Sequence, residues 1–310
     1  MSLLCVTGYR APVDTRAHDA GMFGPGSEAW ALDREAMLLL GAGPRALLLQ
    51  LAHPSVAAGV ADHSDFRADP WRRLDGTLRS YLRIIYGSTA QARAEIRRLN
   101  AFHRTITGPG YRAHDPDLAM WVHATLVDST IVANDVWLGP LPRVRAVRFY
   151  EETRSLGQVF GVPDATLPRD LDAFEAYLAD QLGPDGPVRV GATARDLAEA
   201  VVHPPLPGLL ARLPLDPRLH AWTLWPAIGL LPPTIRDAYG FDWNLRHRLV
   251  SRWLVNTWRA WNTVLPPVVR HMPQALAADR RVALDPSTAC WARGRPQELR
   301  LSARCSSPER

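Results

Sequence analysis

The chain has 310 residues, 47% of them hydrophobic, which is enough to bury a large core as one or two domains. Its cysteines, Cys5, Cys290 and Cys305, lie near the two ends without CxxC or CxxCH spacing, which argues against a disulfide framework, a cysteine zinc site and covalently attached haem. Every basic residue is an arginine, and the arginines are interleaved with acids at a formal net charge of +5, so nucleic-acid binding is not expected. The lack of lysine also excludes Schiff-base chemistry on a lysine.

The first part of the chain predicts an extended lead-in and then two helices. Residues 1–27 are rich in Gly, Pro and small polar residues, and a helix is expected from about Glu28 to Leu40. A break from Gly41 to Pro44 is expected to start the second helix. That helix carries Leu47, Leu48, Leu51 and Ala52.

No membrane or export segment is expected. The start of the chain has no cationic region before a long hydrophobic one, and the most apolar stretch, residues 37–54, is interrupted by glycine, proline and arginine. We therefore expect no secretory signal, no transmembrane helix and a cytoplasmic location.

Helical signals continue along the rest of the chain. Asp-Pro pairs at 69–70 and 115–116 mark helix starts, and almost nothing alternates with period two. Further helices are expected at 142–159, 171–181 and 243–265, with short Pro-broken segments at 195–235. The sequence thus predicts an all-α, single-domain helical bundle over residues 28–284, followed by a polar tail at 285–310 that is disordered or wraps the body.

A histidine occupies an apolar helix position in QARAEIRRLNAFHRTITG, residues 91–108. One face of this predicted helix carries Ala92, Ile96, Leu99, His103 and Ile106. The opposite, solvent face carries Arg93, Glu95, Arg97, Arg98 and Arg104. An imidazole buried without partners costs roughly 1–3 kcal/mol, so His103 needs a neighbouring polar group or a metal.

Other polar residues in this half of the chain give weaker signals. Arg73 and Thr77 are four apart and share one side of a helix, although a solvated face is the commoner explanation. His53 and His63 are each more typical of capping or loop histidines than of ligands. His123 and Asp128 are too far round their helix to share one metal easily.

Common catalytic motifs are absent. The chain has no HExxH, GxSxG, GxGxxG or GxxxxGK[ST] pattern, so zinc hydrolysis, serine catalysis and nucleotide cofactors lack support. From the pattern alone, two interpretations of His103 stay open: a satisfied core residue, or the axial ligand of a noncovalent haem on an all-α scaffold.

Ordered motifs over roughly residues 30–265 resemble a known family. LLLQLAHPSVAAGVADHSDFRADPWRRLDGTLRSYLRIIYG, NAFHRTITG, DPDLAMWVHATLVDS and RFYEETRSLGQVFGVP are similar to the oxygenase MpaB family, which includes the rubber oxygenase (latex-clearing protein) catalytic domain. The resemblance implies a globin-like haem-b fold, a histidine axial ligand and, in rubber oxygenases, dioxygen-dependent cleavage of carbon–carbon double bonds.

The resemblance assigns roles to particular residues. His103 matches the proximal, metal-binding histidine, and Arg73 with Thr77 matches the arginine and threonine of the distal helix. The glutamate that rubber oxygenases place upstream of this arginine is missing, since residues 52–66 offer only His53, Asp62, His63 and Asp65. Gly76 replaces a lysine found beside the threonine in some of them.

The resulting hypothesis is a haem-b-dependent oxygenase that acts with dioxygen on a small apolar unsaturated or aromatic substrate. His103 binds the haem iron, Arg73 and Thr77 position bound oxygen or a propionate, and His63, or less favourably His53, transfers protons. The first alternative is a non-enzymatic helical protein that binds haem or a lipid, with His103 structural. The second is a non-haem iron enzyme using His53, His63 and His123.

Overall fold

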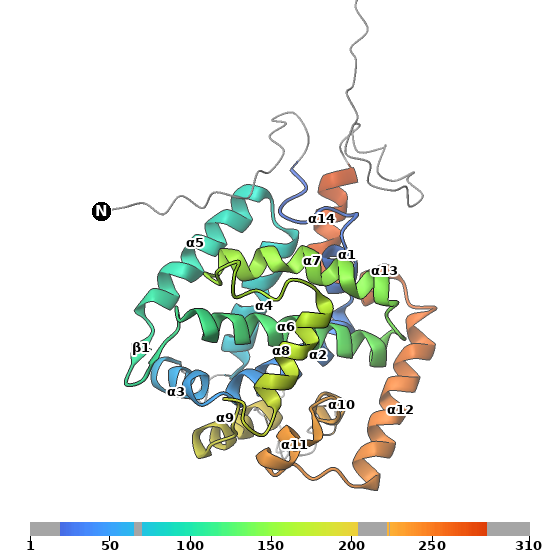
Figure 1. The fold of residues 1–310 in the computed structure, drawn as a ribbon. Coiled ribbons are helices and arrows are strands. Elements are labelled where there is room, and N and C mark those ends of the chain that lie inside the picture. The colour runs from blue at the N-terminus through green and yellow to red at the C-terminus, as the bar shows by residue number, and fades with distance from the viewer. Residues whose placement is uncertain (1–18, 65–69, 204–221, 223, 284–310) are drawn as a thin grey trace, which may run out of the picture.

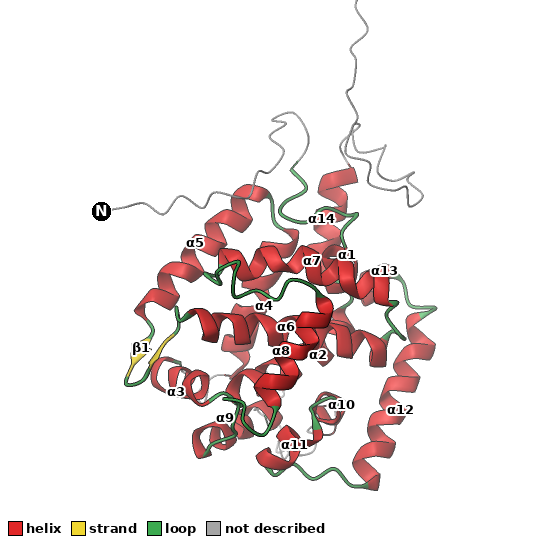
Figure 2. Cartoon of the chain, viewed as in Figure 1, coloured by secondary structure: helices red, strands yellow, loops and turns green. Residues whose placement is uncertain are grey.

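The computed structural model describes residues 19–64, 70–203, 222 and 224–283, and these form an all-α protein with one small hairpin (Figures 1 and 2). The first helices are α1 (Glu28–Asp33), α2 (Ala36–Leu51), α3 (Pro54–His63), α4 (Pro70–Tyr86), α5 (Thr89–Thr105), α6 (Pro116–Trp137) and α7 (Arg143–Val159). The later helices are α8 (Leu171–Leu182), α9 (Ala192–Val202), α10 (Trp225–Gly229), α11 (Pro233–Tyr239), α12 (Leu245–Asn262), α13 (Pro267–Arg270) and α14 (Pro273–Ala283).

A two-stranded antiparallel hairpin interrupts the helices between α5 and α6. Its strands are β1 (Thr107–Gly108) and β2 (Tyr111–Arg112), with Thr107 opposite Arg112 and Gly108 opposite Tyr111. The turn contains Gly110 in the left-handed region at φ 79°, a conformation that favours glycine. The hairpin reverses the chain so that α6 can return through the middle of the molecule (Figure 1).

Helix α6 is the centre of the core. It packs most extensively on α2, and it also contacts α1, α7 and α12. Its Asp115 N-cap accepts hydrogen bonds from the Asp117 and Leu118 amides, as the Asp-Pro start signal predicts. Trp121 on α6 and Trp30 on α1 are fully buried. A helix surrounded by helices explains why α6 buries residues on nearly every side.

The expected break at Gly41–Pro44 is wrong, because α2 runs through both residues. The chain breaks instead at Arg34 and Glu35, between α1 and α2. Gly41 lies against the Trp137 indole of α6, and a Cβ at Gly41 would lie only 2.3 Å from Nε1 of Trp137. This glycine therefore allows close packing of two helices rather than ending one.

Other sequence expectations are met or corrected at single elements. The helices expected near 70–87, 91–108, 115–139, 142–159, 171–181 and 243–265 are confirmed as α4, α5, α6, α7, α8 and α12, except that Ile106 lies just beyond the end of α5. Residues 19–27 form no helix, whereas residues 1–18 and the expected tail at 285–310 lie outside the described residues.

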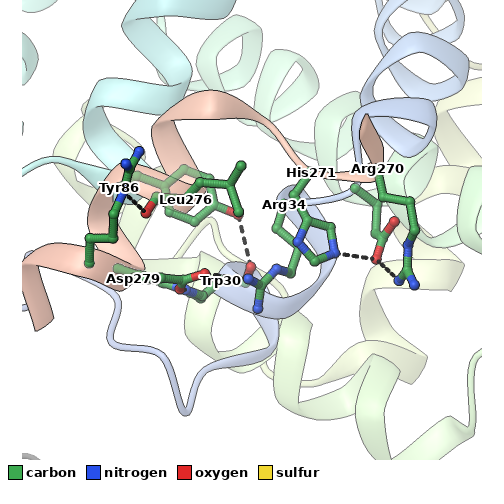
Figure 3. A network of polar contacts seen from close by, with 9 residues as sticks. Trp30, Arg34, Tyr86, Arg270, His271, Leu276 and Asp279 are labelled. Carbon is green, nitrogen blue, oxygen red and sulfur yellow. Dashed lines mark hydrogen bonds and ion pairs between the residues drawn. The ribbon is translucent and has the colours of Figure 1, made fainter. Parts of the chain in front are cut away.

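Helices α13 and α14 were not expected, and they tie the C-terminal part to α1 and α4 (Figure 3). Asp279 of α14 accepts a hydrogen bond from Nε1 of Trp30 at 3.0 Å and pairs with Arg34. Arg281 donates to the Tyr86 carbonyl at 2.7 Å. Glu35 is buried and pairs with Arg270 at 2.8 Å. These contacts hold the ends of α1 and α4 together.

No single described helix is long and apolar enough to cross a membrane. Helices α2 and α3 pass the test of length and composition only as a pair, and the pair is bent by 102°.

Candidate functional site

Helices α4 and α5 form an antiparallel pair around the short turn at Gly87 and Ser88. A capping box between Ser88 and Gln91 begins α5 sharply, so α5 folds straight back along α4. Ser80 of α4 donates to Glu95 of α5 at 2.6 Å, which sets the register of the pair. In that register Arg73 and His103, both near the open end, lie at the same level.

The prediction that Glu95 lies on the solvent face of α5 is wrong. Its side chain is buried, although the helical pattern placed it with the arginines. Hydrogen bonds from Arg98, Ser80 and Arg83 outweigh its burial and lower the pKa of Glu95 to about 2. The charge is therefore satisfied by donors from both helices, and it fastens α4 to α5.

His103 lies half-buried near the C-terminal end of α5, beside the Phe102 ring. Among the described residues its imidazole has no hydrogen-bond partner. Burial lowers the pKa of His103, and the positive charges of His114, Arg73 and Arg98 lower it further. The lowered pKa favours the neutral ring, and neither ring nitrogen has a hydrogen-bond partner among the described residues. Neutral imidazole is the form that ligates a metal.

Arg73 and Thr77 are exposed on α4 next to this histidine. The Thr77 hydroxyl donates to the Arg73 carbonyl at 2.9 Å, as the four-residue spacing permits. Within the described part of the chain no carboxylate pairs with the Arg73 guanidinium. Leu74 and Phe102 are 39% and 40% exposed on the same two helices. The open end of the α4–α5 pair therefore presents an imidazole, a guanidinium and apolar side chains.

His63 and His53 each have a hydrogen-bond partner outside this group. His63 is the last residue of α3 rather than part of a loop, and its Nε2 donates to the Thr107 carbonyl of β1 at 3.0 Å. Its ring also meets the edge of Tyr111. His53 caps α3, where its Nδ1 accepts from the Ser55 amide at 3.2 Å. Neither contacts His103, Arg73 or Thr77 among the described residues, and the capping interpretation of His53 is confirmed.

His123 is a second imidazole without a partner, but it lies in the packed core. It is 6% exposed, its Nε2 has no hydrogen-bond partner among the described residues, and burial lowers its pKa to about 4. A Cβ at Gly157 would lie 3.2 Å from this ring and 2.9 Å from Leu167. Such close packing leaves no room for a large planar ligand at His123.

Asp128 pairs with an arginine of a neighbouring helix. Arg45 of α2 pairs with Asp128 at 2.7 Å, donates to Ser129 at 2.8 Å, and donates to the Leu230 carbonyl at 2.8 Å. No group of three His, Cys, Asp or Glu side chains that could hold a metal occurs among the described residues. The non-haem iron alternative at His53, His63 and His123 therefore has no supporting geometry.

Two features near the site were missed from the sequence. His114 lies after the hairpin, where its Nε2 donates to the Asn100 carbonyl at 3.0 Å, and its charge acts on His103. Asp33 of α1 is fully buried against α4 and accepts from the Tyr81 hydroxyl at 2.8 Å. Burial raises the pKa of Asp33 to about 7. In the sequence, the one sign of the Asp33–Tyr81 contact is that Tyr81 follows Thr77 by one helical turn.

Two cavities lie outside the open end of α4 and α5. One of about 320 Å³ is bounded by α6, α10 and α12, where Trp243, Ser251 and Arg259 line it. The other, of about 540 Å³, lies at the β1–β2 hairpin and is lined by Thr107, Tyr111 and neighbouring residues. His103 lines neither cavity.

The residues at the open end of α4 and α5 suit haem b. Among the described residues the imidazole and the guanidinium have no hydrogen-bond or ion-pair partner, so they would be available to haem iron and to a propionate, and exposed Leu74 and Phe102 would contact the porphyrin. The donor set that this haem needs is therefore present on two adjacent helices.

Comparison with known proteins identifies the family of the chain. A family model described as "ER-bound oxygenase mpaB/B'/Rubber oxygenase, catalytic domain" matches residues 30–260. The chain belongs to this family. The match covers α1 through most of α12, so the MpaB/rubber oxygenase catalytic domain includes the α4–α5 pair, the hairpin and the α6 core. The family is one of oxygenases, enzymes that act on a small-molecule substrate with dioxygen.

Two curated relatives each match 232 residues of the chain. Uncharacterized protein Rv2237 of Mycobacterium tuberculosis is 28% identical over 232 residues, covering 71% of this chain and 87% of the relative. Uncharacterized protein Mb2261 of Mycobacterium bovis has the same identity and coverage. No solved structure matches the chain significantly.

Proposed function

We propose that this protein is a haem-b-dependent oxygenase with His103 as its axial ligand. The observation that carries the proposal is the His103 ring, which is half-buried, held neutral and without a hydrogen-bond partner among the described residues. His123 on α6 also has a ring nitrogen without a hydrogen-bond partner among the described residues, but Gly157 and Leu167 enclose it. Membership of an oxygenase family supports the same function.

Arg73 and Thr77 each have a role in this proposal. Haem b, when bound, supplies the redox chemistry by which dioxygen reacts with an organic substrate. Arg73 would hold a propionate, since its planar guanidinium suits a carboxylate. Thr77 presents its hydroxyl one turn along the same helix, where it would act with Arg73 to position dioxygen or a propionate. A globin-like arrangement of helices around the haem is part of this proposal.

His63 is the proposed proton-transfer residue, because the chain lacks the glutamate that rubber oxygenases place upstream of the distal arginine. Its Nε2 donates to the Thr107 carbonyl, so the neutral ring carries its proton there and leaves Nδ1 free to accept another. The α3 terminus and the hairpin hold this ring at one fixed position.

The proposed substrate is a small apolar unsaturated or aromatic molecule, since Leu74 and Phe102 offer apolar contacts. The proposed location is the cytoplasm.

The test is the visible absorption spectrum of protein purified from haem-supplied cells. We expect a Soret band in the wild type and its loss, by about tenfold or more in haem content, in His103→Ala. The matched control is His114→Ala, a neighbouring histidine that donates to a backbone carbonyl and should leave the band in place. Circular dichroism checks that both variants are folded.

Two results would contradict the proposal. Full haem occupancy with an unchanged spectrum in His103→Ala would contradict the assignment of His103 as the iron ligand. A colourless wild type that shows no Soret absorbance after hemin is added would instead support a non-enzymatic binding protein.

A further inference from the structure

Helix α12 exposes apolar side chains along its outer side. Seven of the thirteen large hydrophobic residues that are exposed in the described part of the chain fall between residues 245 and 269, so the exposure is concentrated there. These residues are Leu245, Leu249, Trp253, Trp261, Val264, Val268 and Val269. Leu245, Leu249 and Trp253 follow each other at four-residue spacing and are 56–62% exposed. The opposite side of α12, with Ser251 and Val255, faces the protein.

The position of α12 makes this side accessible. The helix runs along the outer edge of the molecule, where its buried side meets α6 and α10 (Figure 1). The apolar exposure continues beyond its C-terminal end through Val264 to Val268 and Val269, at the start of α13. One continuous stretch of chain therefore presents apolar side chains to the solvent.

Uncompensated positive charge accompanies this stretch. From Leu245 to His271 the sequence contains five arginines and no aspartate or glutamate. Arg259 donates to backbone carbonyls of α6, and Arg270 pairs with Glu35. Arg246, Arg248 and Arg252 have no acidic partner among the described residues, although Arg246 lies over the Trp225 ring. The segment from Leu245 to His271 therefore carries three arginines without an acidic partner among the described residues.

Helical geometry places the arginines beside the apolar residues. At 100° per residue, Arg248 and Arg252 lie on the flank between the exposed Leu245–Leu249–Trp253 side and the buried side. Arginine side chains at this position can reach phosphate groups while the tryptophan ring stays between polar and apolar layers. A helix with leucine and tryptophan on one side and flanking arginines is typical of segments that lie in a membrane interface.

We propose that α12 and the segment up to Val269 bind the surface of an anionic lipid bilayer, with the helix axis parallel to the membrane plane. Charge decides between this occupant and a second copy of the chain. A twofold contact would bring the same arginine-rich segment, which has no acidic residue of its own, of both copies together, whereas anionic lipid phosphates neutralise it. Binding at the interface requires no membrane-spanning helix. The proposal does not depend on haem or on oxygenase activity.

The first test measures sedimentation of the full chain with lipid vesicles. Vesicles of phosphatidylcholine with about one quarter phosphatidylglycerol should bind the protein at least about tenfold more strongly than pure phosphatidylcholine. Trp253→Glu should lower the partition coefficient about tenfold or more, because a charge replaces the central apolar contact. The control is Val144→Glu on α7, a residue 67% exposed outside this surface, which should leave binding unchanged.

The second test separates charge from apolar contact. The double variant Arg248→Glu and Arg252→Glu should abolish the preference for anionic vesicles, whereas Arg93→Glu on α5 should keep it. Raising the salt from about 0.1 M to about 0.5 M should weaken wild-type binding, since screening shortens the reach of the arginines. Circular dichroism of each variant checks the fold.

Three outcomes would overturn the proposal. One is a wild type that does not bind anionic vesicles, and another is equal binding by the wild type and Trp253→Glu. The third is a change from dimer to monomer in Trp253→Glu without vesicles, measured by sedimentation equilibrium, which would assign this surface to a second copy of the chain.

Discussion

Two helix pairs in this protein treat their polar side chains in opposite ways. Between α2 and α6, the buried Arg45 guanidinium is matched by Asp128, Ser129 and the Leu230 carbonyl. At the open end of α4 and α5, His103 and Arg73 have no such partners among the described residues. A polar group whose bonds are all made within the chain stabilises the fold, whereas one left unmatched at an open face is available to a ligand.

The largest expected effect would come from breaking the matched pair. Arg45→Ala should destabilise the protein by about 3–5 kcal/mol, because it leaves Asp128 without its cation in a mostly buried position. Chemical denaturation measures this change. The control is Arg79→Ala on α4, whose partner Asp75 is exposed, and there we expect a change below about 1 kcal/mol. Equal effects of the two substitutions would show that burial of the ion pair does not matter.

Asp33 lies between these extremes, since only one of its buried oxygens has a partner. Because burial raises the pKa of Asp33 to about 7, the folded protein keeps this proton after the unfolded chain has lost it. The free energy of unfolding should therefore fall as the pH rises from about 4 to about 7, by an amount on the order of a few kcal/mol.

Asp33→Asn tests this pH dependence. The neutral amide keeps an acceptor for the Tyr81 hydroxyl but does not titrate, so the decline in the free energy of unfolding between about pH 4 and 7 should become shallower. Denaturation curves at several pH values measure it. An unchanged slope would mean that another group titrates.

Substitutions at two glycines test how tightly each helix pair is packed, since Gly41 lies between α2 and α6 and Gly76 lies on α4. Gly41→Ala should destabilise α2 by about 1–3 kcal/mol, because the new methyl group meets the Trp137 indole. Gly76→Ala on α4 has open space around its new methyl group and should stabilise the protein by about 0.5–1 kcal/mol. Thermal unfolding gives both signs, and a stabilising Gly41→Ala would refute the close packing of α2 on α6.

The smallest expected effect is at Thr77. Thr77→Val should change the free energy of unfolding by less than about 0.5 kcal/mol, since the hydroxyl is exposed and bonds only within its own helix. Thr153→Val on α7 should destabilise by roughly 1 kcal/mol, because that hydroxyl is buried and donates to the Phe149 and Tyr150 carbonyls. A larger loss at Thr77 than at Thr153 in denaturant titrations would contradict the view of α4 as an open face.

Local signals in the sequence predicted most helices well. Asp-Pro starts and apolar spacing located α4 and α6, and the same spacing selected His103 as a polar group on a buried face. The failures share one physical cause. Whether Gly41 breaks a helix depends on Trp137 of another helix, and Glu95 is buried because arginines and a serine from two helices satisfy it. Such partners are distant in sequence and leave no periodic pattern.

In the candidate site, too, local features could be predicted from the sequence, whereas those that depend on the fold could not. The spacing of Arg73 and Thr77 is visible in the sequence because both lie on one helix. The charge of His114 acts on His103 because the β1–β2 hairpin reverses the chain between them. No rule of sequence spacing could have predicted this interaction. The family resemblance supplied the order of the motifs, and the family match confirms the family itself.

The contact between α14 and α1 has a consequence for how the chain folds during synthesis. Trp30 and Asp279 are separated by 249 positions, so the ribosome completes nearly the whole domain before the partner of Trp30 exists. Until then the indole nitrogen of Trp30 and the guanidinium of Arg34 lack the acceptor that they share in the native structure. Closure of the N-terminal region must be a late event, and a nascent chain halted before α14 is expected to be a target for chaperones.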